Sequence, residues 1–202
     1  MKPSSAMGAA LSAILLLAAC GKGEPDVPKQ GNIGLGADEG AAVTVVEYAS
    51  VTCSACAAWQ TEVWPHFKTK YVDNKKVRYV LHEFPTPPQD IAVAGFLVAR
   101  CAGEDSYFDV VDKIMKAQPE MATSAPRTVL LRIAQEHGMD EVAFKNCISD
   151  PEAVAAMGTR IQQAQAVGVT GTPTFMVNGE VVTDPSLENL SSRIDALLGA
   201  EQ

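Results

Sequence analysis

Apolar and β-branched residues run almost without interruption from Val43 to Ser50, and Glu47 is the only charged residue among them. Such a run predicts a strand that is buried on both faces inside a sheet. Residues 77–84 alternate well enough for a second strand, which the prolines after it should stop. Between the two strands, apolar side chains at helical spacing predict a helix from about Ser54 to Tyr71, interrupted by Pro65.

Residues 89–167 show helical periodicity only. The expected helices cover residues 90–102, 105–117, 124–136, 140–147 and 150–167. Ser124 and Asp140 are the expected N-caps of the third and fourth helices, and Asp150 followed by a proline is the start signal of the fifth. We interpret this stretch as an all-helical insertion between the second strand and the rest of a sheet.

A β-hairpin is predicted after the insertion. Asn178-Gly179 joins two β-branched runs, 172–177 and 180–183, and Asn-Gly between such runs is a strong hairpin signal. Asp184-Pro185 is expected to open a final amphipathic helix. Together these elements predict one α/β domain over residues 41–200.

The N-terminus has the pattern of an export signal. Lys2 is followed by an apolar run over residues 9–17, and small residues then precede Cys20. Leu-Ala-Ala-Cys at this point resembles a bacterial lipobox, in which the cysteine carries lipid and becomes the mature N-terminus. Residues 1–19 are therefore predicted to be a lipoprotein signal peptide, with an ordinary secretory signal as the alternative. The apolar run is too short for a membrane-spanning helix.

Residues 20–40 are rich in Gly, Pro and charge and have no hydrophobic period, so we expect a flexible tether between lipid and domain. The predicted location is the periplasm, with Cys20 as the lipid anchor. Gly21 stands where lipoproteins retained at the inner membrane have Asp. By that analogy, the outer membrane is favoured if the host is Gram-negative.

Composition and net charge exclude some domain arrangements and classes of function. The chain has 202 residues, 47% of them hydrophobic, which suits one elaborated domain better than two. Its 16 Lys and Arg against 24 Asp and Glu give a net charge of −8, and no basic run exists. Nucleic-acid binding is therefore not expected. We expect a monomer.

The cysteines carry the candidate chemistry. Cys53 and Cys56 follow the first strand directly and lie at the start of the next helix, where unpaired N–H groups and the helix dipole favour a thiolate. Cys53 is the predicted nucleophile, and Cys56, one turn further on, can resolve a mixed disulfide. Five cysteines less Cys20 leave four, an even number for an oxidising compartment. Cys101 and Cys147 form the second expected pair, although two buried free thiols remain the alternative.

The order strand, Cys-x-x-Cys helix, strand, helical insertion, Gly-Thr-Pro, hairpin and final helix resembles the DsbA-like branch of the thioredoxin superfamily. The resemblance implies a thioredoxin fold with an all-helical subdomain inserted at about residues 89–167. It also implies that Cys53 is exposed and Cys56 buried. Pro173 would be the cis-proline that faces the disulfide, with Thr172 before it.

Two further roles depend on that resemblance. A cis bond before Pro173 is cheap for an X–Pro pair, and it would turn the backbone of Thr172 outward to pair with an extended substrate. The alternative is an ordinary turn before the hairpin. Glu47 would be the acid beneath the disulfide, with a raised pKa that lets it relay the proton of Cys56. Alternatively, Glu47 points to solvent at a strand end.

The resemblance implies an exported protein thiol-disulfide oxidoreductase, in the first instance an oxidase. Its partners would be reduced or unfolded exported proteins, and a membrane redox partner that restores the active state. Strongly oxidising members have Pro-His between the cysteines, whereas this chain has Ser54-Ala55, so its thiolate should be less stabilised. A reductase or isomerase is the first alternative, and a redox-inactive lipid-anchored binding protein is the second.

No metal or nucleotide cofactor is implied. A zinc site would need two more ligands near Cys53 and Cys56. Haem attachment would need His directly after Cys56, where the chain has Ala57. We expect His66 and His82 at the surface or at strand ends, and His137 in the last turn of a helix.

Overall fold

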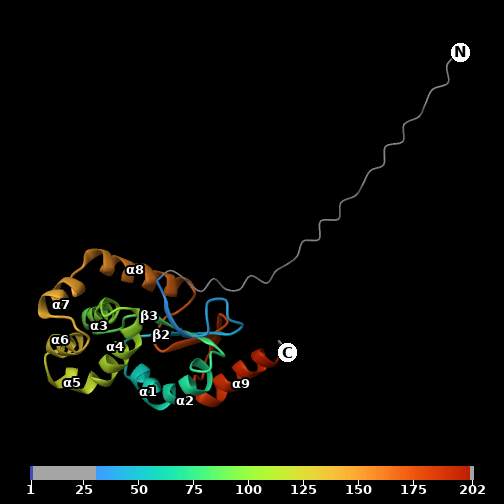
Figure 1. The fold of residues 1–202 in the computed structure, drawn as a ribbon, viewed down its shortest axis with the longest axis horizontal. Coiled ribbons are helices and arrows are strands. Elements are labelled where there is room, and N and C mark those ends of the chain that lie inside the picture. The colour runs from blue at the N-terminus through green and yellow to red at the C-terminus, as the bar shows by residue number, and fades with distance from the viewer. Residues whose placement is uncertain (2–30, 201–202) are drawn as a thin grey trace.

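The computed structural model describes Met1 and residues 31–200. Within them, five strands form one sheet in the order β1-β3-β2-β4-β5 (Figure 1). The strands are β1 (Ile33–Gly36), β2 (Thr44–Ala49), β3 (Arg78–Glu83), β4 (Thr174–Val177) and β5 (Glu180–Val182). β2 and β3 are parallel, and the other neighbouring pairs are antiparallel.

Helices cover both faces of the sheet. They are α1 (Ser54–Glu62), α2 (Trp64–Phe67), the π-helical turn η1 (Lys68–Val72), α3 (Gln89–Cys101), α4 (Glu104–Lys116), α5 (Gln118–Thr123), α6 (Pro126–Glu136), α7 (Glu141–Ile148), α8 (Pro151–Ala166) and α9 (Leu187–Gly199). Figure 1 shows α8 on one side of the sheet, α1, α2 and α9 on the other, and α3–α7 grouped beside it.

The central strand β2 is buried on both faces, as its apolar run predicts. Because side chains alternate along a strand, Val46 and Tyr48 face α8, whose Ala164 belongs to the same cluster. Val45 lies on the opposite face, in the main core with Trp59 of α1 and residues of α9 and the insertion. The sheet therefore separates two apolar clusters, and α1 starts at the end of its most buried strand.

The inserted subdomain is all-helical, as predicted, but it contains one helix more than the periodicity indicates. Asp140 and Asp150 cap α7 and α8 with their side chains, as expected. The cap predicted at Ser124 is wrong: Ser124 ends the short helix α5, and α6 begins at Pro126 after Ala125. Six residues are too few to show a helical period in the sequence.

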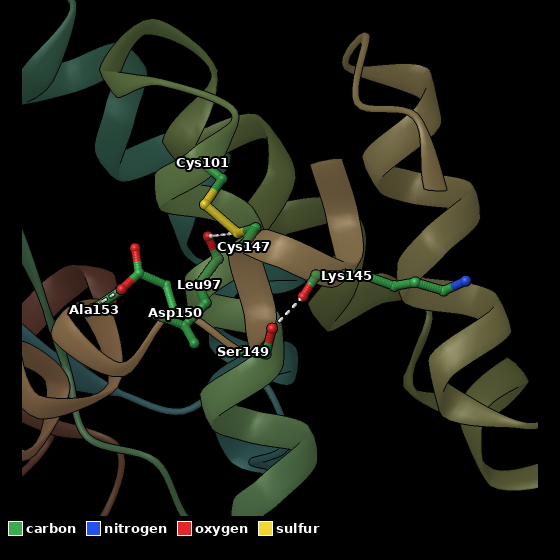
Figure 2. The surroundings of a disulfide bond; sticks show 7 residues. All are labelled: Leu97, Cys101, Lys145, Cys147, Ser149, Asp150 and Ala153. Carbon is green, nitrogen blue, oxygen red and sulfur yellow. Dashed lines mark hydrogen bonds between the residues drawn. A yellow bond between two sulfur atoms is a disulfide. The ribbon is translucent and has the colours of Figure 1, made fainter. Parts of the chain in front are cut away.

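A disulfide joins the first and fifth helices of this subdomain (Figure 2). Cys101, the last residue of α3, is bonded to Cys147 of α7, with Cα atoms 6.3 Å apart. This is the pair that the cysteine count predicts. Cys147 Sγ also lies 3.1 Å from the carbonyl oxygen of Leu97, a van der Waals contact because a disulfide sulfur has no hydrogen to donate.

The tether predicted over residues 20–40 is wrong at its C-terminal end. Ile33–Gly36 forms β1, which pairs antiparallel with β3 at one edge of the sheet. Its glycines permit close packing rather than flexibility. A Cβ on Gly36, whose φ is +90°, would lie 2.4 Å from the carbonyl oxygen of Val77. The close packing of β1 against β3 requires glycine at these positions, and glycine-rich composition is also typical of linkers.

The predicted interruption at Pro65 is confirmed: α1 ends at Glu62, and Pro65 lies in the first turn of α2, where its missing N–H costs nothing. One other boundary differs from the prediction. The final helix begins at Leu187 with Ser186 as its cap, two residues after the predicted start. The hairpin turn is as predicted, with positive φ at Asn178 and Gly179.

The predicted signal peptide and the lipid-attachment residue Cys20 lie outside the described residues. Between residues 31 and 200, the helices are too short or too polar to cross a membrane.

Candidate functional site

Cys53 is the N-cap of α1, directly after the end of β2. Its backbone is extended, with φ −84° and ψ 117°, and its Sγ accepts the N–H of Cys56 at 3.2 Å. Cys53 is half-buried, whereas Cys56 is completely buried. The end of β2 therefore places the Cys53 sulfur at the surface, and the first turn of α1 places the Cys56 sulfur beneath it.

The two thiols differ in acidity. The hydrogen bond with the Cys56 side chain, helped by donors from Thr172 and from the backbone of Cys56 and Ala55, lowers the pKa of Cys53 to about 6, although partial burial opposes this. The same hydrogen bond, burial and the charge of Glu47 raise the pKa of Cys56. At neutral pH the exposed sulfur is a thiolate and the buried one keeps its proton.

Glu47 lies in the middle of β2, and its side chain is buried, at 1% exposure. This excludes the alternative in which it points to solvent. Its Oε2 accepts a hydrogen bond from the hydroxyl of Tyr79 on β3, while Oε1 has no hydrogen-bond partner among the described residues. Burial outweighs this hydrogen bond and raises the pKa of Glu47 to about 8, with the charge of Cys53 adding to the effect.

The loop before β4 lies against the reactive sulfur. The peptide bond between Thr172 and Pro173 is cis, as predicted. The carbonyl oxygen of Thr172 lies 3.4 Å from Cys53 Sγ and accepts a hydrogen bond from that sulfur when it is protonated. Thr172 and Pro173 are both partly exposed, so this backbone edge and Cys53 share one surface although 119 residues separate them.

Gln118 of α5 also belongs to the site, and the sequence analysis missed it. Its side-chain amide donates hydrogen bonds to the carbonyl oxygens of Val51, at 2.9 Å, and Cys53, at 3.0 Å. The inserted subdomain is thereby fixed to the backbone of the reactive cysteine. The periodicity gives no sign of this contact because α5 is too short.

Tyr79 was missed as well, although the sequence holds a signal for it. In the parallel pair, Val45 lies opposite Tyr79 and Glu47 opposite Leu81. Because side chains alternate along a strand, Tyr79 lies on the same face of the sheet as Glu47, and the residue opposite it, Val45, is two positions before Glu47. The strand register would have indicated this contact.

The prediction for His82 is wrong. Its side chain is completely buried beneath α8, with Nε2 3.0 Å from the carbonyl oxygen of Arg160, and burial lowers its pKa. It lies on the face of the sheet opposite Glu47, away from the thiols. Across residues 31–200, no three His, Cys, Asp or Glu side chains come close enough to hold a metal ion.

A model of the family described as Thioredoxin matches residues 29–196, most of the chain. The chain belongs to the thioredoxin family. The structure of alpha-DsbA1 from Wolbachia pipientis superimposes with a TM-score of 0.77 at 25% identity, covering 86% of this chain and 94% of that one. BdbD from Bacillus subtilis, at 21% identity, has the same fold with a TM-score of 0.73, covering 84% of this chain and 94% of its own.

These matches confirm the predicted DsbA-like thioredoxin fold with its helical insertion. Among curated sequences, proteins named "Putative protein-disulfide oxidoreductase" in Rickettsia prowazekii and Rickettsia typhi are 34% and 35% identical over 162 residues. The matched region is 79% of this chain and 59% of each relative. This thioredoxin-family chain therefore matches about three fifths of the length of those relatives.

Proposed function

We propose that this protein is a protein thiol-disulfide oxidoreductase with Cys53 and Cys56 as its redox pair. The observation that carries the proposal is the asymmetry of the two sulfurs. Cys53 is accessible, capped by a helix N-terminus and held as a thiolate, while Cys56 is buried one turn away with a raised pKa. The names of the Rickettsia relatives support the same chemistry.

In the oxidising direction, a substrate thiolate attacks Cys53 Sγ of the enzyme disulfide. The Cys53–Cys56 bond breaks, a mixed disulfide forms, and the sulfur of Cys56 leaves and takes up a proton. A second substrate thiolate then attacks the substrate sulfur and releases Cys53 as a thiolate. The substrate loses two electrons and two protons overall. The enzyme gains the two electrons, one proton goes to Cys56, and the other goes to solvent because Cys53 leaves as a thiolate.

Glu47 is the proposed proton relay for Cys56. It is buried, carries a proton at neutral pH and is coupled electrostatically to both sulfurs. A neutral carboxyl can give its proton to Cys56 as that sulfur leaves, and the carboxylate can take it back in the reverse reaction. Burial prevents water from doing the same directly.

Thr172 and Pro173 form the proposed docking edge. The carbonyl oxygen of Thr172 is beside the reactive sulfur, at 3.4 Å, so an extended substrate bonded to Cys53 passes over this backbone. There it can add a short strand-like pairing. The reduced or unfolded proteins expected as substrates offer such extended segments.

The oxidase direction is favoured over reduction or isomerisation. A low pKa at Cys53 stabilises the reduced enzyme, and a stable reduced form makes an enzyme a better oxidant. The hydrogen bond with the Cys56 side chain, followed by those from Thr172 and from backbone donors, supports this low pKa without a charged residue at Ser54 or Ala55.

The direction is tested by the equilibrium of the Cys53–Cys56 pair against glutathione, with parallel assays of reduced-substrate oxidation and insulin reduction. We expect efficient oxidation, and a Cys53→Ser variant should be inactive in both assays. Cys101→Ala combined with Cys147→Ala is the matched control, since it removes the disulfide within the insertion and leaves the redox pair. A strongly reducing potential with rapid insulin reduction would reverse the direction, and an inactive wild type would favour a binding protein.

We also propose export to the periplasm and attachment to a membrane through lipid on Cys20, where a membrane redox partner would reoxidise the pair. The Leu-Ala-Ala-Cys pattern supports this. Growth with labelled palmitate should label the wild type and leave a Cys20→Ser variant unlabelled. Label on neither protein would indicate an ordinary secretory signal.

A further inference from the structure

A cavity of about 240 Å³ opens beside Cys53, on the side of the inserted subdomain. Thr52, the residue before Cys53, and Gln118 give its wall polar groups. The rest of the wall is apolar and includes Pro88, Ile91, Met121 and Ala122. Four elements therefore meet at the cavity: the loop before α1, the start of α3, α5, and the first residue of α6, Pro126.

The cavity lies next to the proposed redox centre. Its wall includes the residue before Cys53, and consecutive Cα atoms are about 3.8 Å apart. A protein substrate of the proposed oxidoreductase is bonded to Cys53 in the mixed disulfide. Successive residues of an extended chain advance about 3.3 Å each, so neighbours of the substrate cysteine are within reach of the cavity.

Size and lining define the occupant. Pockets for small ligands and cofactors usually exceed about 300 Å³, so this cavity suits one amino-acid side chain better than a cofactor. Its apolar wall lacks charged groups that would hold an ionic side chain. Apolar surface removed from water here would contribute to binding in proportion to its area.

We propose that this cavity receives an apolar side chain of the substrate polypeptide, close in sequence to the substrate cysteine, and so selects among exported proteins. The inference rests on the proposed function and adds a second contact to the Thr172 edge. Ile91, Met121 and Ala122 are the specificity-determining residues.

Gln118 connects the wall of this pocket to the backbone of Cys53. It belongs to the pocket wall, and its amide donates to the carbonyl oxygens of Val51 and Cys53. The wall formed by α5 therefore keeps a fixed position relative to the reactive cysteine. A side chain seated in the pocket holds the substrate chain in register with Cys53 Sγ, which favours the reacting geometry.

The test compares peptides with two cysteines and one variable residue, Leu or Ser, moved through the three positions on either side of the first cysteine. Oxidised full-length protein reacts with each peptide in a single turnover, in which the peptide dithiol becomes a disulfide and the enzyme disulfide becomes a dithiol. At one or two positions we expect Leu to raise the second-order rate constant about tenfold over Ser.

Ala122→Phe fills the pocket from an exposed position on α5. It should bring the Leu-to-Ser rate ratio close to one. Thr123→Phe is the matched control: it is the next residue on α5, also exposed, but it does not line the pocket, and it should keep the wild-type ratio. Because each ratio is taken within one preparation, differences in folding or active fraction cancel.

The outcomes separate this inference from the proposed function. Wild-type protein that oxidises all peptides equally, or an Ala122→Phe variant that keeps the preference, would overturn the pocket and leave the oxidoreductase intact. Wild-type protein that oxidises no peptide and does not react with glutathione would overturn both.

Discussion

Two neighbouring strands each bury one glutamate, and the two side chains have opposite surroundings. Glu83, at the end of β3, is completely buried and accepts hydrogen bonds from Arg100 and Arg160, both at 2.6 Å, and from Tyr107 at 2.9 Å. Glu47, on β2, is just as deeply buried, but among the described residues its one hydrogen-bond partner is the hydroxyl of Tyr79.

The difference shows how one side-chain type serves two purposes. A buried carboxylate with two guanidinium partners joins the elements that carry them, here β3, α3 and α8. A buried carboxyl without a cation keeps its proton to higher pH. In the proposed mechanism, the Glu47 carboxyl exchanges a proton with Cys56. The Glu83 region therefore joins elements of the fold, and the Glu47 region belongs to the proposed chemistry.

The largest effect should come from Glu83→Gln. This change keeps the shape of the side chain but leaves Arg100 and Arg160 without their carboxylate, and breaking a buried ion pair costs about 3–5 kcal/mol. Urea unfolding monitored by circular dichroism measures the loss. Glu39→Gln, which removes the exposed partner of Arg78, is the control and should cost much less. Similar losses in the two variants would show that the buried network does little for stability.

The same substitution at Glu47 should have the opposite sign. Because its folded-state pKa is about 8 and its ordinary value is 4.5, Glu47 favours the folded state fully below pH 4.5 and loses this contribution as the pH rises to 8. Glu47→Gln cannot ionise, so it should be more stable than wild type by about 3 kcal/mol at pH 7. The advantage should shrink towards pH 4, and unfolding curves across this range measure it. A constant difference would contradict the raised pKa.

Glu47→Gln should also slow the resolution of a mixed disulfide at Cys53. General acid–base groups contribute roughly a hundredfold or more, so a loss near a hundredfold is expected at pH 8. In wild type, the rate should rise with pH and level off above about 8, where Glu47 is ionised and can accept the Cys56 proton. Stopped-flow release of a peptide thiol from the mixed disulfide gives this profile. An unchanged profile in the variant would rule out the relay.

Residues in short sequence patterns could be predicted without the structure, whereas contacts between distant segments could not. Cys53, Cys56, Thr172 and Pro173 belong to short patterns whose chemistry depends on spacing, so they can be recognised without coordinates. The apolar residues around Glu47 favour its burial, but its orientation could not be predicted because a lone charge in a strand can point either way.

The contacts between distant segments could not be predicted. Glu83 and Arg160 are 77 residues apart, and nothing local marks either as a partner of the other. Gln118 lies on a helix of six residues, below the length at which periodicity is visible. The sequence analysis placed β1 in a tether because close packing at the sheet edge selects glycine, which also dominates linkers.

The smallest predicted effects come from the two tyrosines that donate to these glutamates. Tyr107→Phe removes one of the hydrogen bonds to Glu83 in its ion-pair network and should cost about 2 kcal/mol, because hydrogen bonds in ion-paired groups are the stronger class. Tyr79→Phe removes a bond to a carboxyl that is neutral at pH 7 and should cost about 1 kcal/mol. It should also move the stability-versus-pH inflection of Glu47 to higher pH, since that bond opposes the effect of burial. Urea unfolding of both variants between pH 4 and 9 separates the two effects. A shifted inflection in Tyr107→Phe instead would mean that the hydrogen bond at Glu47 does not set this pH dependence, and the contrast between the two regions would fail.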